Sequence, residues 1–128
     1  MSEPNRSTGV VLVVDDEEMV RDVAVAILGS AGHETLSAAD GAAGVELFRQ
    51  NVDRIDVVLL DMKMPGMDGP ATCAAILEIR PDAKVILSSG FAAAEAASRF
   101  EGMALAGFVQ KPYRMADMLG AVAKAMAG

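Results

Sequence analysis

The 128-residue sequence lacks the features that would place it in a membrane or in an oxidising compartment. It has one cysteine, Cys73, which has no partner within the chain for a disulfide. Its apolar runs are far shorter than the ~18 residues that a membrane-spanning helix needs. The first nine residues, MSEPNRSTG, are polar and have no apolar segment typical of a signal peptide. We therefore expect a cytoplasmic protein that makes no contact with a membrane.

Positive charge is also scarce. There are 11 Lys and Arg residues against 18 Asp and Glu, which gives a net charge of −7. This balance argues against nonspecific binding to nucleic acid or to an acidic membrane surface. It is consistent with a site that gathers carboxylates around a cation. The sequence also lacks a glycine-rich nucleotide loop of the GxxxxGK[ST] type, so a bound nucleotide is not the expected phosphoryl donor.

What remains is enough apolar material for one folded domain. The chain is 52% hydrophobic and 23% charged, which is typical of a globular protein with a single core. We expect a disordered lead-in over residues 1–8 and one domain over residues 9–127.

Short apolar segments alternate with segments of helical period. The segments predicted to be strands are 10–14, 34–37 (the weakest), 55–60, 85–87 and 108–109. The residues expected to share one face of a helix are Val20, Val23, Ala24, Ile27 and Leu28 in the first, Val45, Leu47 and Phe48 in the second, and Met115, Met118, Leu119, Val122 and Met126 in the last. Gly32 follows the first helix, Pro70 fits the first position of the third, and Pro81 follows its end. A fourth helix is expected within 91–100. This alternation predicts an α/β fold with a parallel sheet covered by helices on both faces.

Polar residues stand at the end of four predicted strands. Asp15 and Asp16 end the first strand, Asp61 the third, Ser88 and Ser89 the fourth, and Lys111 the fifth. In an open parallel sheet, ligands bind outside the carboxyl ends of the strands, so these groups are expected in one crevice. Each has an ordinary structural alternative, such as helix capping for Asp15, Asp16 and the serines or a turn for Asp61. Those alternatives do not explain why all of them fall at carboxyl ends.

Three carboxylates beside a lysine suit phosphoryl transfer. Mg²⁺ binds two or more acidic oxygens and leaves positions for a phosphate oxygen. Lys111 supplies a cation for a second phosphoryl oxygen, and a serine hydroxyl donates to a third. Asp61 is then a candidate nucleophile that forms an aspartyl phosphate.

The motifs VLVVDDEE, LLDMKMPGMDG, ILSSG and FVQKP occur in this order and closely resemble those of the receiver domain of two-component response regulators. The resemblance covers roughly residues 9–127. It implies a flavodoxin-like (βα)₅ fold, with helices on both faces of a five-stranded parallel sheet of order 2-1-3-4-5.

The resemblance also assigns roles at the acceptor and the metal site. Asp61 corresponds to the phosphorylated aspartate. Asp16 corresponds to the acid that binds Mg²⁺ directly, and Asp15 to the one that acts through water. Lys63 corresponds to the residue whose backbone carbonyl completes the metal site.

The switch residues follow in the same way. Ser89 corresponds to the switch serine or threonine, and Lys111 to the lysine that contacts the phosphoryl group. The bond from Lys111 to Pro112 is expected to be cis. Phe108 corresponds to the aromatic switch position, where a phenylalanine has no hydroxyl to hydrogen-bond.

The resemblance implies a switch that takes a phosphoryl group from a histidine kinase or a histidine phosphotransfer protein, and that signals to a partner or to an attached kinase or effector domain. We expect no enzymatic activity beyond self-catalysed phosphotransfer and slow loss of the phosphoryl group. Two alternatives remain open: a pseudo-receiver that binds partners without phosphorylation, and an aspartyl-nucleophile phosphatase. Phosphatases of this kind have a second acid two residues after the nucleophile, where this chain has Lys63.

Overall fold

The computed structural model describes residues 8–62, 66–90 and 105–127. Its elements are β1 (Val10–Val14), α1 (Glu18–Ser30), β2 (Glu34–Ala38), α2 (Gly41–Gln50), β3 (Val57–Asp61), α3 (Gly69–Ile79), β4 (Val85–Ser89), β5 (Gly107–Gln110) and α5 (Met115–Ala127). The expected lead-in, apart from Thr8, and the expected fourth helix lie outside the described residues.

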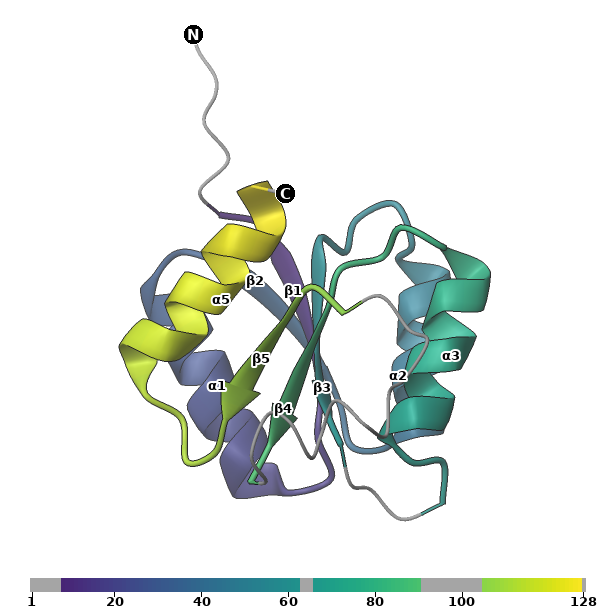
Figure 1. Ribbon diagram of the computed structural model, residues 1–128, viewed down its shortest axis with the longest axis horizontal. Coiled ribbons are helices and arrows are strands. Elements are labelled where there is room, and N and C mark those ends of the chain that lie inside the picture. The colour runs from purple at the N-terminus through teal and green to yellow at the C-terminus, as the bar shows by residue number, and fades with distance from the viewer. Residues whose placement is uncertain (1–7, 63–65, 91–104, 128) are drawn as a thin grey trace, which may run out of the picture.

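The five strands form one parallel sheet of order β2-β1-β3-β4-β5, as the sequence predicts (Figure 1). β1 and β3 lie at the centre, and their residues are almost all buried because helices cover both faces of the sheet. β2 is an edge strand with exposed polar positions, which explains its weak signal in the sequence. All strands run in one direction, so their carboxyl ends meet at one edge, at the bottom of Figure 1.

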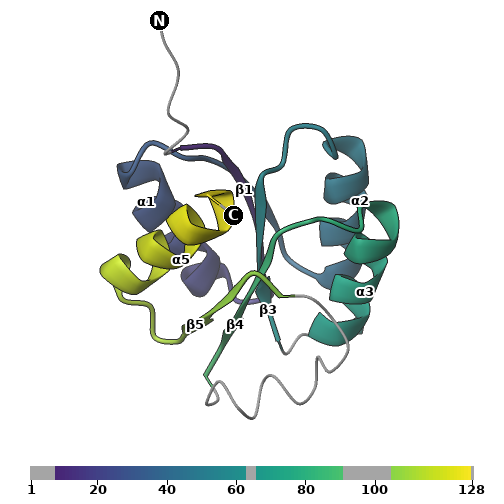
Figure 2. The same cartoon turned by 45° about the horizontal axis from the view of Figure 1, so that its top comes forward.

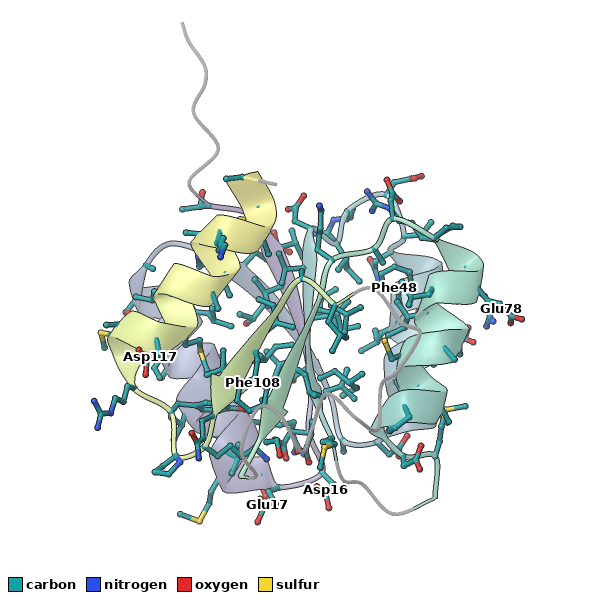
Figure 3. The ribbon with its side chains drawn as sticks, viewed as in Figure 1. Asp16, Glu17, Phe48, Glu78, Phe108 and Asp117 are labelled. Atoms are coloured by element: carbon teal, nitrogen blue, oxygen red, sulfur yellow. The ribbon has the colours of Figure 1, made fainter. Side chains whose placement is uncertain are left out.

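Two helices cover each face of the sheet. α1 and α5 lie on one face and α2 and α3 on the other, and both views show this arrangement (Figures 1 and 2). Successive residues of a strand point to opposite faces, so each strand contributes to two cores. Val13 and Leu59 belong to the core beneath α1 and α5. Leu12 and Leu60 belong to the core beneath α2 and α3, together with Phe48 (Figure 3).

Strands β3, β4 and β5 end further along the chain than the apolar segments predict. β3 begins at Val57 rather than at residue 55 and ends on Asp61 itself. β4 extends to Ser89 and β5 to Gln110, beyond the apolar residues. Asp61, Ser88 and Ser89 therefore belong to strands, because backbone pairing continues past the last apolar side chain. Asp15, Asp16 and Lys111 follow the strands that they were expected to end.

The helix signals are confirmed in part. Gly32, after α1, has a φ of +94°, and Pro81 follows α3, but Pro70 is the second residue of α3 because Gly69 begins it. The predicted helix faces are wrong at two residues: Val23 is 48% exposed and Met115 is 54% exposed.

Within the described parts of the chain, no helix has the length and apolar character to cross a membrane.

Candidate phosphoryl-acceptor site

The predicted site residues meet at the carboxyl edge of the sheet. Asp15 follows β1, Asp61 ends β3, Ser89 ends β4, and Lys111 follows β5. A cavity of about 360 Å³ opens here, and its walls include Asp16, Asp61, Ser89 and Lys111. Figure 3 shows Asp16 at this edge of the molecule, just beyond the carboxyl end of β1.

Three carboxylates and one ammonium form the centre of the site. Carboxylate oxygens of Asp15, Asp16 and Asp61 all lie within 4.8 Å of one another. Lys111 Nζ lies 2.9 Å from Asp15 Oδ2 and 3.0 Å from Asp61 Oδ1, and so bridges two of the acids. Asp15 and Asp61 are buried, whereas Asp16 is exposed to solvent.

Asp15 is fixed by the chain that leads into α1. Its Oδ1 accepts a hydrogen bond of 2.9 Å from the backbone N–H of Glu17, and its backbone carbonyl accepts one of 2.9 Å from Arg21 Nη1. The capping alternative for the two acids does not hold, because the N-cap of α1 is Glu17, which makes no side-chain capping bond. The sequence did not predict this contact between Arg21 and the backbone of Asp15.

The turn after Asp61 begins α3 close to the acceptor. Asp68 caps α3 by accepting a hydrogen bond from the N–H of Ala71, and the N–H of Gly69 donates to the carbonyl of Met62 at 3.0 Å. Gly66 has a φ of +76°, a conformation that favours glycine. The predicted carbonyl ligand, Lys63, lies outside the described residues.

Burial sets the electrostatics of the acceptor. Burial, together with smaller effects of the charges of Asp15 and Asp16, raises the pKa of Asp61 from 3.8 to about 6, against the opposing effect of the hydrogen bond and charge of Lys111. Burial alone would lower the pKa of Lys111, but its hydrogen bond to Asp61 and its close contacts with the charges of Asp15 and Asp61 prevail and raise it. Lys111 therefore stays charged while the three acids repel one another.

The arrangement fits a hard divalent cation. Asp15 Oδ2 is buried and has no partner aligned for a hydrogen bond, although it lies in ion-pair contact with Lys111. Together with oxygens of Asp16 and Asp61 it offers a set of carboxylate ligands, and no nitrogen or sulfur ligand belongs to this described cluster. Oxygen-only ligands at a solvent-facing edge suit Mg²⁺, which keeps several of its waters.

The two predicted switch residues lie on neighbouring strands. Ser89 is buried at the end of β4, and the backbone N–H of Lys111 donates to its carbonyl at 2.8 Å. Phe108 on β5 is partly buried and packs against the core beneath α2 and α3 (Figure 3). The bond between Lys111 and Pro112 is cis, as expected.

Sequence reasoning missed one more contact beside the site. Tyr113 donates a hydrogen bond of 3.1 Å from its hydroxyl to Ser88 Oγ. Two features of the sequence could have indicated this contact: the serine pair at 88 and 89, and a hydroxyl-bearing aromatic residue two positions after Lys111.

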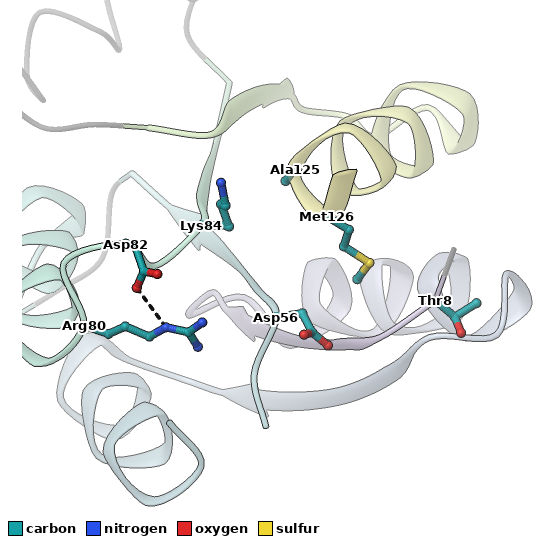
Figure 4. A pocket seen from close by; sticks show the side chains of 7 residues that line it. All are labelled: Thr8, Asp56, Arg80, Asp82, Lys84, Ala125 and Met126. Atoms are coloured by element: carbon teal, nitrogen blue, oxygen red, sulfur yellow. Dashed lines mark hydrogen bonds and ion pairs between the residues drawn. The ribbon is translucent and has the colours of Figure 1, made fainter. Parts of the chain in front are cut away.

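A second polar cavity, of about 280 Å³, lies at the opposite edge of the sheet (Figure 4). Its charged lining residues include both signs, and Arg80 Nε is paired with Asp82 at 3.1 Å. Arg80 also donates to the carbonyls of Val52 and Ile55. These contacts hold the end of α3 to the segment that precedes β3. His33 also lies away from the crevice and accepts a hydrogen bond from the N–H of Gly9.

Comparison with known proteins decides the family. The model of the response regulator receiver domain matches residues 11–123. The chain belongs to this family. The resemblance seen in the four motifs is thereby confirmed, as is the sheet order that it implies.

Relatives include both single receivers and parts of larger proteins. The chain is 34% identical over 108 residues to the sensor kinase CckA of Brucella abortus, covering 84% of this chain but 11% of that protein. It is 32% identical to the chemotaxis protein CheY of Treponema pallidum, covering 96% and 86%. A receiver domain protein from Clostridium thermocellum superposes with a TM-score of 0.85 at 29% identity, covering 93% and 94%. The chain thus matches most of some receivers and spans only a small part of the sensor kinase.

Proposed function

We propose that this receiver domain takes a phosphoryl group onto Asp61 from a histidine kinase or a histidine phosphotransfer protein, with Mg²⁺ bound beside it, and then signals by a change of conformation. The observation that carries the proposal is the bridge from Lys111 Nζ to Asp15 and Asp61 within a three-carboxylate cluster. A nucleophile, a cation and a place for a metal ion lie together at the edge of the sheet.

In the proposed reaction, an oxygen of Asp61 attacks the phosphorus atom of the donor. A bond forms between Asp61 and phosphorus, and the bond from phosphorus to the donor's leaving atom breaks with its electron pair. Lys111 pairs with an oxygen of the transferring group, and the Ser89 hydroxyl donates to another. Bound through Asp15, Asp16 and Asp61, Mg²⁺ would neutralise the charge that develops on the phosphoryl oxygens.

The signal is proposed to arise from Ser89 and Phe108. A phosphoryl group on Asp61 attracts the Ser89 hydroxyl, which changes the packing between β4 and β5, where Phe108 lies. With no hydroxyl, Phe108 can respond only by a change of packing. Beyond accepting and slowly losing its phosphoryl group, the protein is proposed to have no enzymatic activity. The proposed setting is cytoplasmic, without direct contact with nucleic acid, and the partner is a separate protein or an attached kinase or effector domain.

The test is incubation with Mg²⁺ and acetyl phosphate, followed by intact mass measurement. We expect a mass increase of one phosphoryl group in the parent protein and none in Asp61→Asn, which keeps the shape of the side chain but removes the nucleophile. Rapid consumption of acetyl phosphate without an adduct would indicate a phosphatase, and no reaction at all would indicate a pseudo-receiver. An adduct of full yield in Asp61→Asn would show that another residue is the acceptor.

A further inference from the structure

Tyr113 connects the segment between β5 and α5 to a buried residue of β4. It is the only tyrosine in the chain and lies two residues after Lys111. Its hydroxyl donates the 3.1 Å hydrogen bond to Ser88 Oγ, and Ser88 is 1% exposed. The body of Tyr113 packs against the core beneath α1 and α5. A hydrogen bond therefore joins this connection to a buried side chain of β4.

Ser88 is the direct neighbour of the acceptor across the sheet. The register pairs Asp61 of β3 with Ser88 of β4. Leu59 and Ile86 both face the core beneath α1 and α5, so two residues later Asp61 and Ser88 also point to this face. The hydroxyl of Tyr113 is thus bonded to the side chain next to Asp61.

The chain is attached to β4 at Lys111 itself and again two residues later. Its backbone N–H donates to the carbonyl of Ser89 at 2.8 Å. Two residues later, Tyr113 holds the chain to Ser88. These two attachments fix the backbone from which the Lys111 side chain reaches Asp15 and Asp61, and that side chain is only 17% exposed.

We propose that Tyr113 is a positioning residue for phosphoryl transfer, which acts by bonding Ser88 and so holding Lys111 at Asp61. The inference rests on the proposed function of Asp61. Without the hydroxyl of Tyr113, the segment after Lys111 loses its hydrogen bond to β4, while Lys111 keeps its own backbone bond to Ser89. Its ammonium then spends less time where it can pair with the transferring phosphoryl group, which slows the reaction.

A purely structural role predicts a different result. Removing one partner leaves a buried hydroxyl unpaired and lowers stability, whereas removing both partners together is nearly neutral for stability. The double variant Ser88→Ala/Tyr113→Phe therefore separates the two roles. If the bond only stabilises the fold, the double variant recovers the behaviour of the parent; if it positions Lys111, the double variant stays slow.

The experiment follows the rate of phosphorylation by acetyl phosphate at saturating Mg²⁺, read by intact mass, beside the melting temperature of each variant. Tyr113→Phe and Ser88→Ala should each react roughly three- to tenfold more slowly than the parent, and the double variant should be no slower than Tyr113→Phe. Ser88→Thr, which keeps an acceptor hydroxyl, should stay within about twofold of the parent. Thr72→Val is the matched control, because it removes a buried hydroxyl that bonds the carbonyl of Asp68 in α3.

Three results would overturn the inference while leaving the proposed function intact. The first is a parent that is phosphorylated while Tyr113→Phe and Ser88→Ala react within twofold of it. The second is a double variant whose rate returns to that of the parent. The third is a loss of rate in Thr72→Val equal to that in Tyr113→Phe, which would show that general destabilisation is the cause. A parent protein that accepts no phosphoryl group would instead overturn the proposed function, and the inference with it.

Discussion

At the acceptor, burial and charge act against the ionised carboxylate of Asp61. Its pKa is raised from 3.8 to about 6, so the folded protein holds this proton more tightly than the unfolded chain does. A raised carboxyl pKa stabilises the fold fully only at low pH, and this contribution is lost as pH rises through the folded value. The site is therefore a source of instability at neutral pH in the absence of a cation.

We predict that Asp61→Asn stabilises the protein at neutral pH and has little effect in acid. In a chelating buffer, the free energy of unfolding of the variant should exceed that of the parent by on the order of 2 kcal/mol above about pH 6, with the difference shrinking toward pH 4. Urea unfolding at a series of pH values measures it. Asp53→Asn, which removes an exposed carboxylate, separates burial from the loss of one negative charge. A stability difference that does not depend on pH would contradict this account of Asp61.

Lys111 is expected to act on the phosphoryl group rather than on the metal. Lys111→Ala should slow phosphorylation by acetyl phosphate roughly a hundredfold, because one preorganised charge opposite the transferring group is lost. Mg²⁺ affinity should persist or increase, because a positive charge between Asp15 and Asp61 disappears. Mg²⁺ titration followed by melting temperature gives the second quantity. Lys84→Ala is the control, since Lys84 lines the cavity at the opposite edge of the sheet. Loss of Mg²⁺ binding in Lys111→Ala would reverse the assigned role.

At the scale of elements, the sequence predicted which strands exist and where their ends meet. Strand signals were strong where both faces are buried, as at β1 and β3, and weak at the edge strand β2. The extent of β4 to Ser89 was not predictable from hydrophobicity, because backbone pairing with β5 carries the strand past its apolar residues. The exposure of Val23 and Met115 depends on which elements pack against each helix. The helical period of the sequence does not specify this packing.

The candidate site was predictable to the same degree. Asp15, Asp16, Asp61 and Lys111 were placed together because parallel strands align their carboxyl ends. The contact between Tyr113 and Ser88 was not predicted, because it depends on the path of the connection after β5.

The junction between β3 and α3 gives a prediction at this scale. A methyl group on Gly69 would lie 2.6 Å from the carbonyl oxygen of Met62 and 2.8 Å from that of Asp61, closer than real contacts allow. Gly69→Ala should lower the free energy of unfolding by about 1–3 kcal/mol, since α3 must move away from the acceptor strand. Gly29→Ala in α1 is the matched control: nothing lies within 4 Å of its methyl position, so it should stabilise by roughly 0.5–1 kcal/mol. Equal effects of the two substitutions in urea unfolding would show that α3 does not depend on this close approach.

At the scale of the whole molecule, one end of the sheet concentrates the acidity of the chain. The net charge is −7, and three of the acids converge at the carboxyl edge, where Lys111 forms ion pairs with two of them, Asp15 and Asp61. The opposite edge carries charges of both signs, and Arg80 and Asp82 form an ion pair there. A divalent cation therefore has one place in the described structure where it relieves repulsion between several carboxylates, and the two ends of the fold should respond to it differently.

Mg²⁺ should accordingly stabilise the folded protein as a whole. A ligand that binds only the folded state adds RT ln(1 + [L]/Kd), or about 2.7 kcal/mol at ~100 Kd, so the melting temperature should rise with Mg²⁺ concentration. Asp16→Ala is the sharpest variant, because Asp16 is exposed and its loss leaves no buried charge unpaired. The rise should largely vanish in Asp16→Ala but persist in Asp22→Ala, which removes an exposed acid further along α1. Sodium chloride of equal ionic strength controls for screening of the net charge. A parent melting temperature that responds equally to both salts would contradict a metal site formed by Asp15, Asp16 and Asp61.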